Sequence, residues 1–114
     1  MQREQRRYPR YDVRIGAEVQ TADKAVTCTT KNLSLGGVAL DLDRALPEGR
    51  PVLVTLFVVV DDIEDLATRP VEVSGTLVWC RQVGPERFEA GIRFDPLAEG
   101  PRGSLQQLLS VGSR

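Results

Sequence analysis

The strongest constraint on the fold is the alternation of apolar and polar residues in short segments of the chain. In 12-DVRIGAEVQ-20, Val13, Ile15, Ala17 and Val19 fall on alternate positions. This period of two places one set of side chains on each face of an extended strand. The segment therefore predicts a strand with one buried face.

Five further segments predict strands: 25–32, which is rich in β-branched residues, 38–43, which alternates, and 52–60, 71–80 and 87–94. Gly, Pro, Asn and Asp separate them, as expected for turns. The run 52-VLVTLFVVV-60 is apolar on both faces and indicates a central strand. Six or seven short strands with no helix between them favour an all-β fold, a small antiparallel β-barrel. Closing the barrel would protect strand edges that otherwise invite aggregation.

The carboxyl-terminal segment has a different pattern. In 104-SLQQLLSV-111, Ser104 could cap a helix, and Leu105, Leu108 and Leu109 recur at helical spacing. We expect a short helix that covers one end of the barrel. A chain of 114 residues is long enough for one domain with its own core.

Composition argues against catalysis. The chain contains no histidine, which removes the commonest general base and a common metal ligand. Four of the acidic residues fall in 61-DDIED-65, which reads as a solvated loop without metal-binding spacing. Cys28 and Cys80 lie in apolar runs and are interpreted as buried free thiols. We expect no enzyme, no metal and no cofactor.

The sequence predicts a cytoplasmic protein. Its longest apolar run, 52–60, is far shorter than the roughly 20 residues that a membrane-spanning helix needs. The polar, arginine-rich start does not have the pattern of a secretory signal.

The amino-terminal segment concentrates positive charge. Five of the first 14 residues are arginine (Arg3, Arg6, Arg7, Arg10 and Arg14), although the formal net charge of the chain is −1. Pro9 prevents a continuous helix and favours an extended conformation before it. We expect residues 1–11 to form a flexible arginine-rich arm and residues 12–114 to form the barrel with its helix. On composition alone, a solvated, flexible terminus without a ligand is the favoured explanation of the arm.

A second motif, 32-NLSLGG-37, lies between two predicted strands. A turn is expected there, but a turn alone requires neither Ser34 after Asn32 nor Gly36 beside Gly37. Asn32 and Ser34 offer hydrogen-bonding side chains, and Gly37 would allow a ligand to approach the backbone.

The two motifs together are more specific than either alone. Arg6 and Arg10 form R-x-x-x-R, and Asn32, Ser34 and Gly37 form N-x-S-x-x-G about 20 residues later. This arrangement resembles the PilZ domain family, whose members are receptors for the bacterial second messenger cyclic di-GMP. The similarity extends to 76-TLVWC-80 and 87-RFEAGIRF-94 and covers roughly residues 4–111. Asn32 stands where the family often has Asp, and the acidic stretch 60–70 and the short carboxyl-terminal helix are departures from its pattern.

The resemblance implies a ligand-binding site for cyclic di-GMP made by Arg6, Arg7, Arg10, Asn32, Ser34, Gly36 and Gly37, with Arg7 as a further stacking contact. The chemistry agrees, because a guanidinium group can clamp phosphate oxygens, pair with the O6 and N7 edge of guanine, and stack on a purine. Ligand binding would fold the arm onto the barrel and change the surface offered to a downstream protein partner, in motility or biofilm regulation. No DNA, RNA or membrane partner is expected.

Two other functions are compatible with the sequence. The first is a PilZ-like structural adaptor that does not bind cyclic di-GMP. The second is a single-stranded nucleic-acid binder, but that role needs a basic groove with stacking aromatics, and aromatic residues make up only 5% of this chain.

Overall fold

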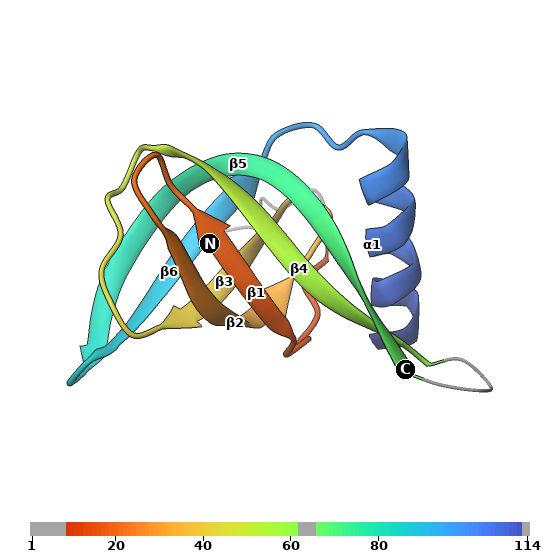
Figure 1. Cartoon of the computed structure of the whole chain (residues 1–114), viewed down its shortest axis with the longest axis horizontal. Helices are drawn as coiled ribbons and strands as arrows, with labels where there is room; N and C mark the ends of the chain where they lie inside the picture. Colours follow the sequence, from red (N-terminus) through yellow and green to blue (C-terminus); the bar gives the residue numbers. More distant parts are fainter. Residues whose placement is uncertain (1–8, 62–65, 113–114) are drawn as a thin grey trace, which may run out of the picture.

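The computed structural model describes residues 9–61 and 66–112. Within them, six antiparallel strands close into a barrel in the order β1-β2-β3-β6-β5-β4. The strands are β1 (Gly16–Gln20), β2 (Ala25–Leu33), β3 (Gly37–Leu42), β4 (Pro51–Asp61), β5 (Leu66–Gly84) and β6 (Arg87–Phe94), and the helix α1 (Glu99–Gly112) follows. Pairing of β1 with β4 closes the ring. Figure 1 shows the barrel with α1 beside it. The predicted all-β barrel is confirmed, with six strands.

The core follows from the alternation seen in the sequence. Inward-facing aliphatic side chains from every strand fill the barrel, and Leu33, Leu40, Leu56 and Leu77 are among the fully buried ones. Leu105 and Leu109 of α1 are also buried in this cluster. The helix therefore covers apolar surface of the barrel through one face, as its leucine spacing predicts.

The predicted bounds of the helix are wrong at its start. The helix begins at Glu99, so Ser104 lies inside it and does not cap it. The backbone N–H of Arg102 donates to the carbonyl oxygen of Ala98 at 3.0 Å, closing the first turn. Pro101 is tolerated in this turn because its missing N–H has no intrahelical partner there.

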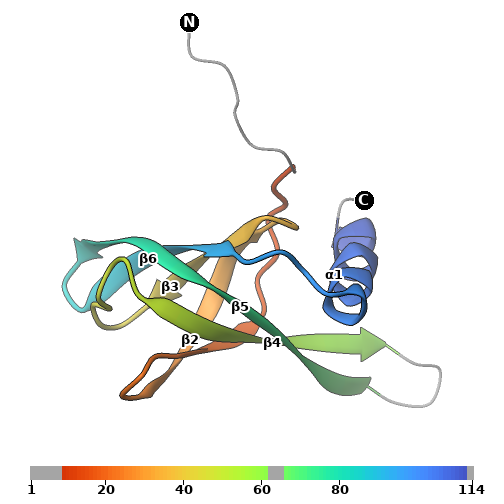
Figure 2. The same ribbon diagram turned by 90° about the horizontal axis from the view of Figure 1, so that it is seen from above.

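The strands β4 and β5 are longer than the sequence pattern indicates. Their antiparallel register runs from Pro51 opposite Thr76 to Asp61 opposite Leu66. In Figure 2 this ribbon extends past the other strands. Pro70 fits within β5 because β6 pairs with β5 only from Gly75 onward, so β4 is the neighbouring strand at Pro70. In the predicted acidic loop, Asp61 ends β4, and residues 62–65 lie outside the described residues.

The two thiols differ from each other. Cys28 is buried as predicted, and burial, followed by the nearby charge of Glu18, raises the pKa of its thiol to about 12. Cys80 is only half-buried, so the prediction of burial is wrong for it. Its Sγ accepts a 3.5 Å hydrogen bond from the backbone N–H of Leu46.

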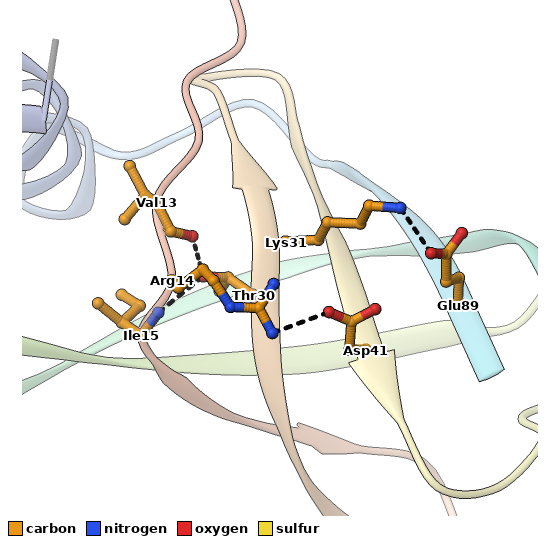
Figure 3. Close-up of polar contacts among 7 residues, drawn as sticks. All are labelled: Val13, Arg14, Ile15, Thr30, Lys31, Asp41 and Glu89. Carbon is orange, nitrogen blue, oxygen red and sulfur yellow. Dashed lines mark hydrogen bonds and ion pairs between the residues drawn. The ribbon is translucent and has the colours of Figure 1, made fainter. Parts of the chain in front are cut away.

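The first predicted strand begins later than expected, at Gly16. Ahead of it, the side chain of Thr30 takes the place of backbone hydrogen bonds between strands. Thr30 is fully buried, and its hydroxyl donates to the carbonyl oxygen of Val13 and accepts from the backbone N–H of Ile15 at 2.9 Å. Figure 3 shows the hydroxyl between the two backbone groups. Thr30 thus attaches the chain ahead of β1 to β2.

We predict that Thr30→Val, which keeps the shape of the side chain, lowers the free energy of unfolding by about 1–3 kcal/mol because it leaves buried backbone groups without partners. Urea unfolding would measure the loss. The matched control is Thr27→Val, an exposed position on the same strand, where a change within about 0.5 kcal/mol is expected. Equal effects of the two substitutions would contradict this role of Thr30.

Candidate functional site

The chain ahead of β1 runs beside the second motif. The backbone N–H of Tyr11 donates to the carbonyl oxygen of Leu33 at 3.0 Å, and the N–H of Leu33 donates to the carbonyl oxygen of Tyr11 at 2.9 Å. Leu33 lies between Asn32 and Ser34, so this bridge brings the exposed Arg10, one residue before Tyr11, next to the motif. Arg6 and Arg7 lie outside the described residues.

Ser34 organises the turn between β2 and β3. Its side chain is buried, and its Oγ accepts hydrogen bonds from the backbone N–H groups of Gly36 at 3.0 Å and Gly37 at 3.2 Å. The backbone N–H of Ser34 donates to the carbonyl oxygen of Gly37 at 2.9 Å. This geometry is a serine-stabilised turn. The hydroxyl therefore shapes the motif from inside.

The two glycines of the motif bring β3 close to its neighbours. A Cβ atom at Gly37 would collide with the backbone carbonyl oxygen of Ile92 on β6. The carbonyl oxygen of Gly36 accepts a 2.9 Å hydrogen bond from the backbone N–H of Phe94. Glycine at position 37 is thus required by the contact between two backbones, whether or not a ligand also approaches it.

Asn32 belongs to β2 and not to the turn. The register of β2 against β3 shifts between Thr30 and Asn32, which marks a β-bulge. Asn32 is half-buried and lies opposite Ala39. Ala39 lies opposite Gly91 of β6, and Gly91 opposite Trp79 of β5. These four residues form a row across the outside of the barrel, which we call the outer row.

An aromatic ring covers part of the outer row. A Cβ atom at Gly91 would overlap the indole ring of Trp79, so the ring lies directly over this glycine. The guanidinium of Arg81 lies over the same ring, 5.3 Å from its centroid, at a distance typical of a cation–π contact. Trp79 therefore packs against the outer surface of the barrel.

Charged side chains border the outer row, and of these only Arg14 stands out in the sequence. Arg14 pairs with Asp41 at 3.1 Å, and Lys31 pairs with Glu89 at 2.5 Å (Figure 3). Arg81 pairs with the other carboxylate oxygen of Glu89 at 3.2 Å. The hydrogen bond from Lys31 and then that from Arg81 hold the pKa of Glu89 below its ordinary value.

Arg93 also lies beside the motif. It is exposed and lies opposite Gly37 in the register of β6 against β3. The alternation in 87-RFEAGIRF-94 could have found it, since buried Ala90, Ile92 and Phe94 leave Glu89, Gly91 and Arg93 for the outer face.

The described part of the site can bind an anion with a planar group. It combines guanidinium and ammonium groups, the amide side chain of Asn32 and the indole ring of Trp79. Within residues 9–61 and 66–112, no group of three or more His, Cys, Asp or Glu residues could hold a metal ion. No helix in these two ranges has the length and apolar character needed to cross a membrane.

Comparison with known proteins identifies the family. The model of the PilZ domain matches residues 4–110, and the chain belongs to the PilZ domain family. No curated protein matches the sequence.

Solved structures of PilZ domains have the same fold. The PilZ domain of YcgR from Escherichia coli, solved with c-di-GMP, aligns with a TM-score of 0.71 at 19% identity and covers 97% of this chain and 93% of that one. The PilZ domain of CeSA from a cellulose-synthesizing bacterium aligns with a TM-score of 0.63 at 17% identity, over 93% and 99% of the two chains.

A longer protein shares the fold over part of its length. The inhibitor of motility MotI/DgrA from Bacillus subtilis aligns with a TM-score of 0.74 at 19% identity and covers 93% of this chain. This chain spans 50% of the length of that protein. At these identities the likeness concerns the fold.

We predict that Gly37→Ala lowers the free energy of unfolding by about 1–3 kcal/mol, because the added methyl group forces β3 away from β6. Gly103→Ala is the control, since a Cβ there meets open space and alanine favours the helix by about 1 kcal/mol. Urea unfolding of both variants would measure the difference. An unchanged stability of Gly37→Ala would show that the strands adjust without cost.

Proposed function

We propose that the chain is a receptor for cyclic di-GMP, bound by Arg6, Arg7 and Arg10 of the amino-terminal segment and by Asn32, Ser34, Gly36 and Gly37 of the second motif. The observation that carries the proposal is the backbone bridge between Tyr11 and Leu33, because Arg10 adjoins Tyr11 in the chain and Leu33 belongs to the second motif. Membership of the PilZ family supports it, and so does the fold shared with the PilZ domain of Escherichia coli YcgR, which was solved with c-di-GMP.

The proposed site residues contribute to ligand binding in different ways, according to their chemistry. The arginines supply charged, forked donors for the two phosphates and the guanine edges. The amide of Asn32 lies at the end of the outer row, where it offers a donor and an acceptor. Ser34 and the glycines act through the turn, because the serine hydroxyl is already engaged by the backbone of Gly36 and Gly37.

Signalling would pass through a second protein. The dianionic ligand draws the arginine-rich segment onto the barrel, and the changed surface is then recognised by a downstream partner, in motility or biofilm regulation. The receptor reads a ligand and carries out no chemistry on it.

A PilZ adaptor without cyclic di-GMP is the second candidate. One observation favours it: the turn geometry accounts for Ser34, and the contact with Ile92 accounts for Gly37, without any ligand. In that case the outer face would serve a protein partner alone.

Calorimetric titration with cyclic di-GMP separates the two functions and gives the stoichiometry. The receptor predicts that wild type binds and that Arg6→Ala and Arg10→Ala each lose about 3–5 kcal/mol of binding free energy, since each arginine makes two or three charge-assisted hydrogen bonds. The matched control is Arg102→Ala, an exposed arginine of α1, which should bind as wild type does.

Undetectable binding by wild type would leave the adaptor as the function. Unchanged affinity in Arg6→Ala and Arg10→Ala would remove the arginines from the site.

A further inference from the structure

The outer face of the barrel carries two carboxylates side by side. Asp41 of β3 and Glu89 of β6 are direct cross-strand partners in the register. Like charges in this position repel each other and destabilise a sheet. Three cations offset the repulsion, because Arg14 pairs with Asp41 while Lys31 and Arg81 pair with Glu89.

Glu89 lies at the centre of this arrangement. Its Oε2 contacts Nζ of Lys31 at 2.5 Å, and its Oε1 contacts a guanidinium nitrogen of Arg81 at 3.2 Å. Lys31 comes from β2 and reaches across β3 to meet it, as Figure 3 shows. The Glu89 side chain is 12% exposed, whereas those of Lys31 and Arg81 are 46% and 68% exposed. The carboxylate is therefore held against the sheet, and the two cations remain accessible from solvent.

The cations held by Glu89 adjoin the proposed ligand surface. Lys31 precedes Asn32 in the bulge, and Arg81 lies over Trp79 at the other end of the outer row. A phosphate group placed on this row would have both cations within reach of their side chains. It would compete with Glu89 for them, because phosphate and carboxylate oxygens attract the same donors.

Exchange of the carboxylate for a phosphate requires little disruption of the fold. Ion pairs with exposed partners contribute about 0–1 kcal/mol to stability. The lowered pKa keeps Glu89 ionised at neutral pH, so its pairing with Lys31 and Arg81 persists there. A ligand, and not a small change in pH, is thus the agent that can release these cations.

We propose that Glu89 is a specificity-determining residue that masks a phosphate subsite formed by Lys31 and Arg81. An isolated phosphate group competes poorly with a carboxylate that is fixed beside the cations. A dinucleotide already bound through its other phosphate presents the second one at high effective concentration and displaces Glu89. The mask therefore selects ligands that are also held by contacts elsewhere on the barrel. This selectivity rests on the proposed function, whereas the masking itself does not.

The test compares two variants with the same change in charge. Glu89→Gln removes the masking charge, and Asp23→Asn removes an exposed carboxylate in the turn between β1 and β2. Each variant and wild type are titrated calorimetrically with inorganic pyrophosphate and with cyclic di-GMP at low ionic strength. Masking predicts that Glu89→Gln binds pyrophosphate about tenfold more tightly than wild type and that Asp23→Asn does not. The gain for cyclic di-GMP should be smaller, because its other contacts do not depend on the mask.

A second substitution assigns the gain to the subsite. Lys31→Ala in the Glu89→Gln background should remove the gain in pyrophosphate affinity. Trp79 is the only tryptophan of the chain and lies beneath Arg81, so pyrophosphate should change the fluorescence of Glu89→Gln more than that of wild type. Glu89→Ser carries the same charge change and serves as a second unmasked variant if the glutamine variant is poorly folded.

The experiment distinguishes failure of the masking role from failure of the receptor function. Equal pyrophosphate affinities in Glu89→Gln and Asp23→Asn would overturn the masking role, and so would a gain that survives Lys31→Ala. If wild type fails to bind cyclic di-GMP while Glu89→Gln gains pyrophosphate binding, the receptor function is overturned and the masking role of Glu89 remains.

Discussion

The attachment of the amino-terminal chain to β2 is the interaction on which the site depends. It has two parts: the buried hydroxyl of Thr30, which bonds to the backbone of Val13 and Ile15, and the backbone bridge between Tyr11 and Leu33. A buried polar group is costly unless it is hydrogen-bonded, so these bonds fix the path of the chain. Because of this path, Arg10 lies next to Asn32 and Ser34 although about 20 residues separate them.

The fold could be predicted from the sequence where side chains alone determine it. Residue patterns predicted all six strands: period-two alternation where one face is buried, and β-branched or apolar runs elsewhere. The sequence pattern did not predict where the strands and the helix begin and end, because hydrogen-bond partners elsewhere in the chain determine these bounds. The replacement of ladder bonds by Thr30 and the extension of β4 and β5 along each other depend on contacts across the fold. The first turn of α1 was missed for a different reason, because glycine disfavours a helix and α1 contains Gly100 and Gly103 near its start.

The second motif could be recognised in the sequence, but the contacts that its residues make could not. The motif 32-NLSLGG-37 was found, and the structure adds that Ser34 bonds to the backbone of its own turn and that Gly37 admits the backbone of β6. Lys31, Arg81 and Glu89 were missed because they come from three strands and meet only through the order of the barrel. A charged residue on an alternating strand has no signal of its own in the sequence.

The closed ring of six strands limits how the protein can respond to anything that it binds. Each strand is hydrogen-bonded to a neighbour on both sides, so widening the ring would break a whole ladder of backbone bonds at once. Small free energies of association cannot drive such an opening. A rearrangement on binding is thereby limited to parts of the chain outside the ring, and the barrel remains a fixed frame.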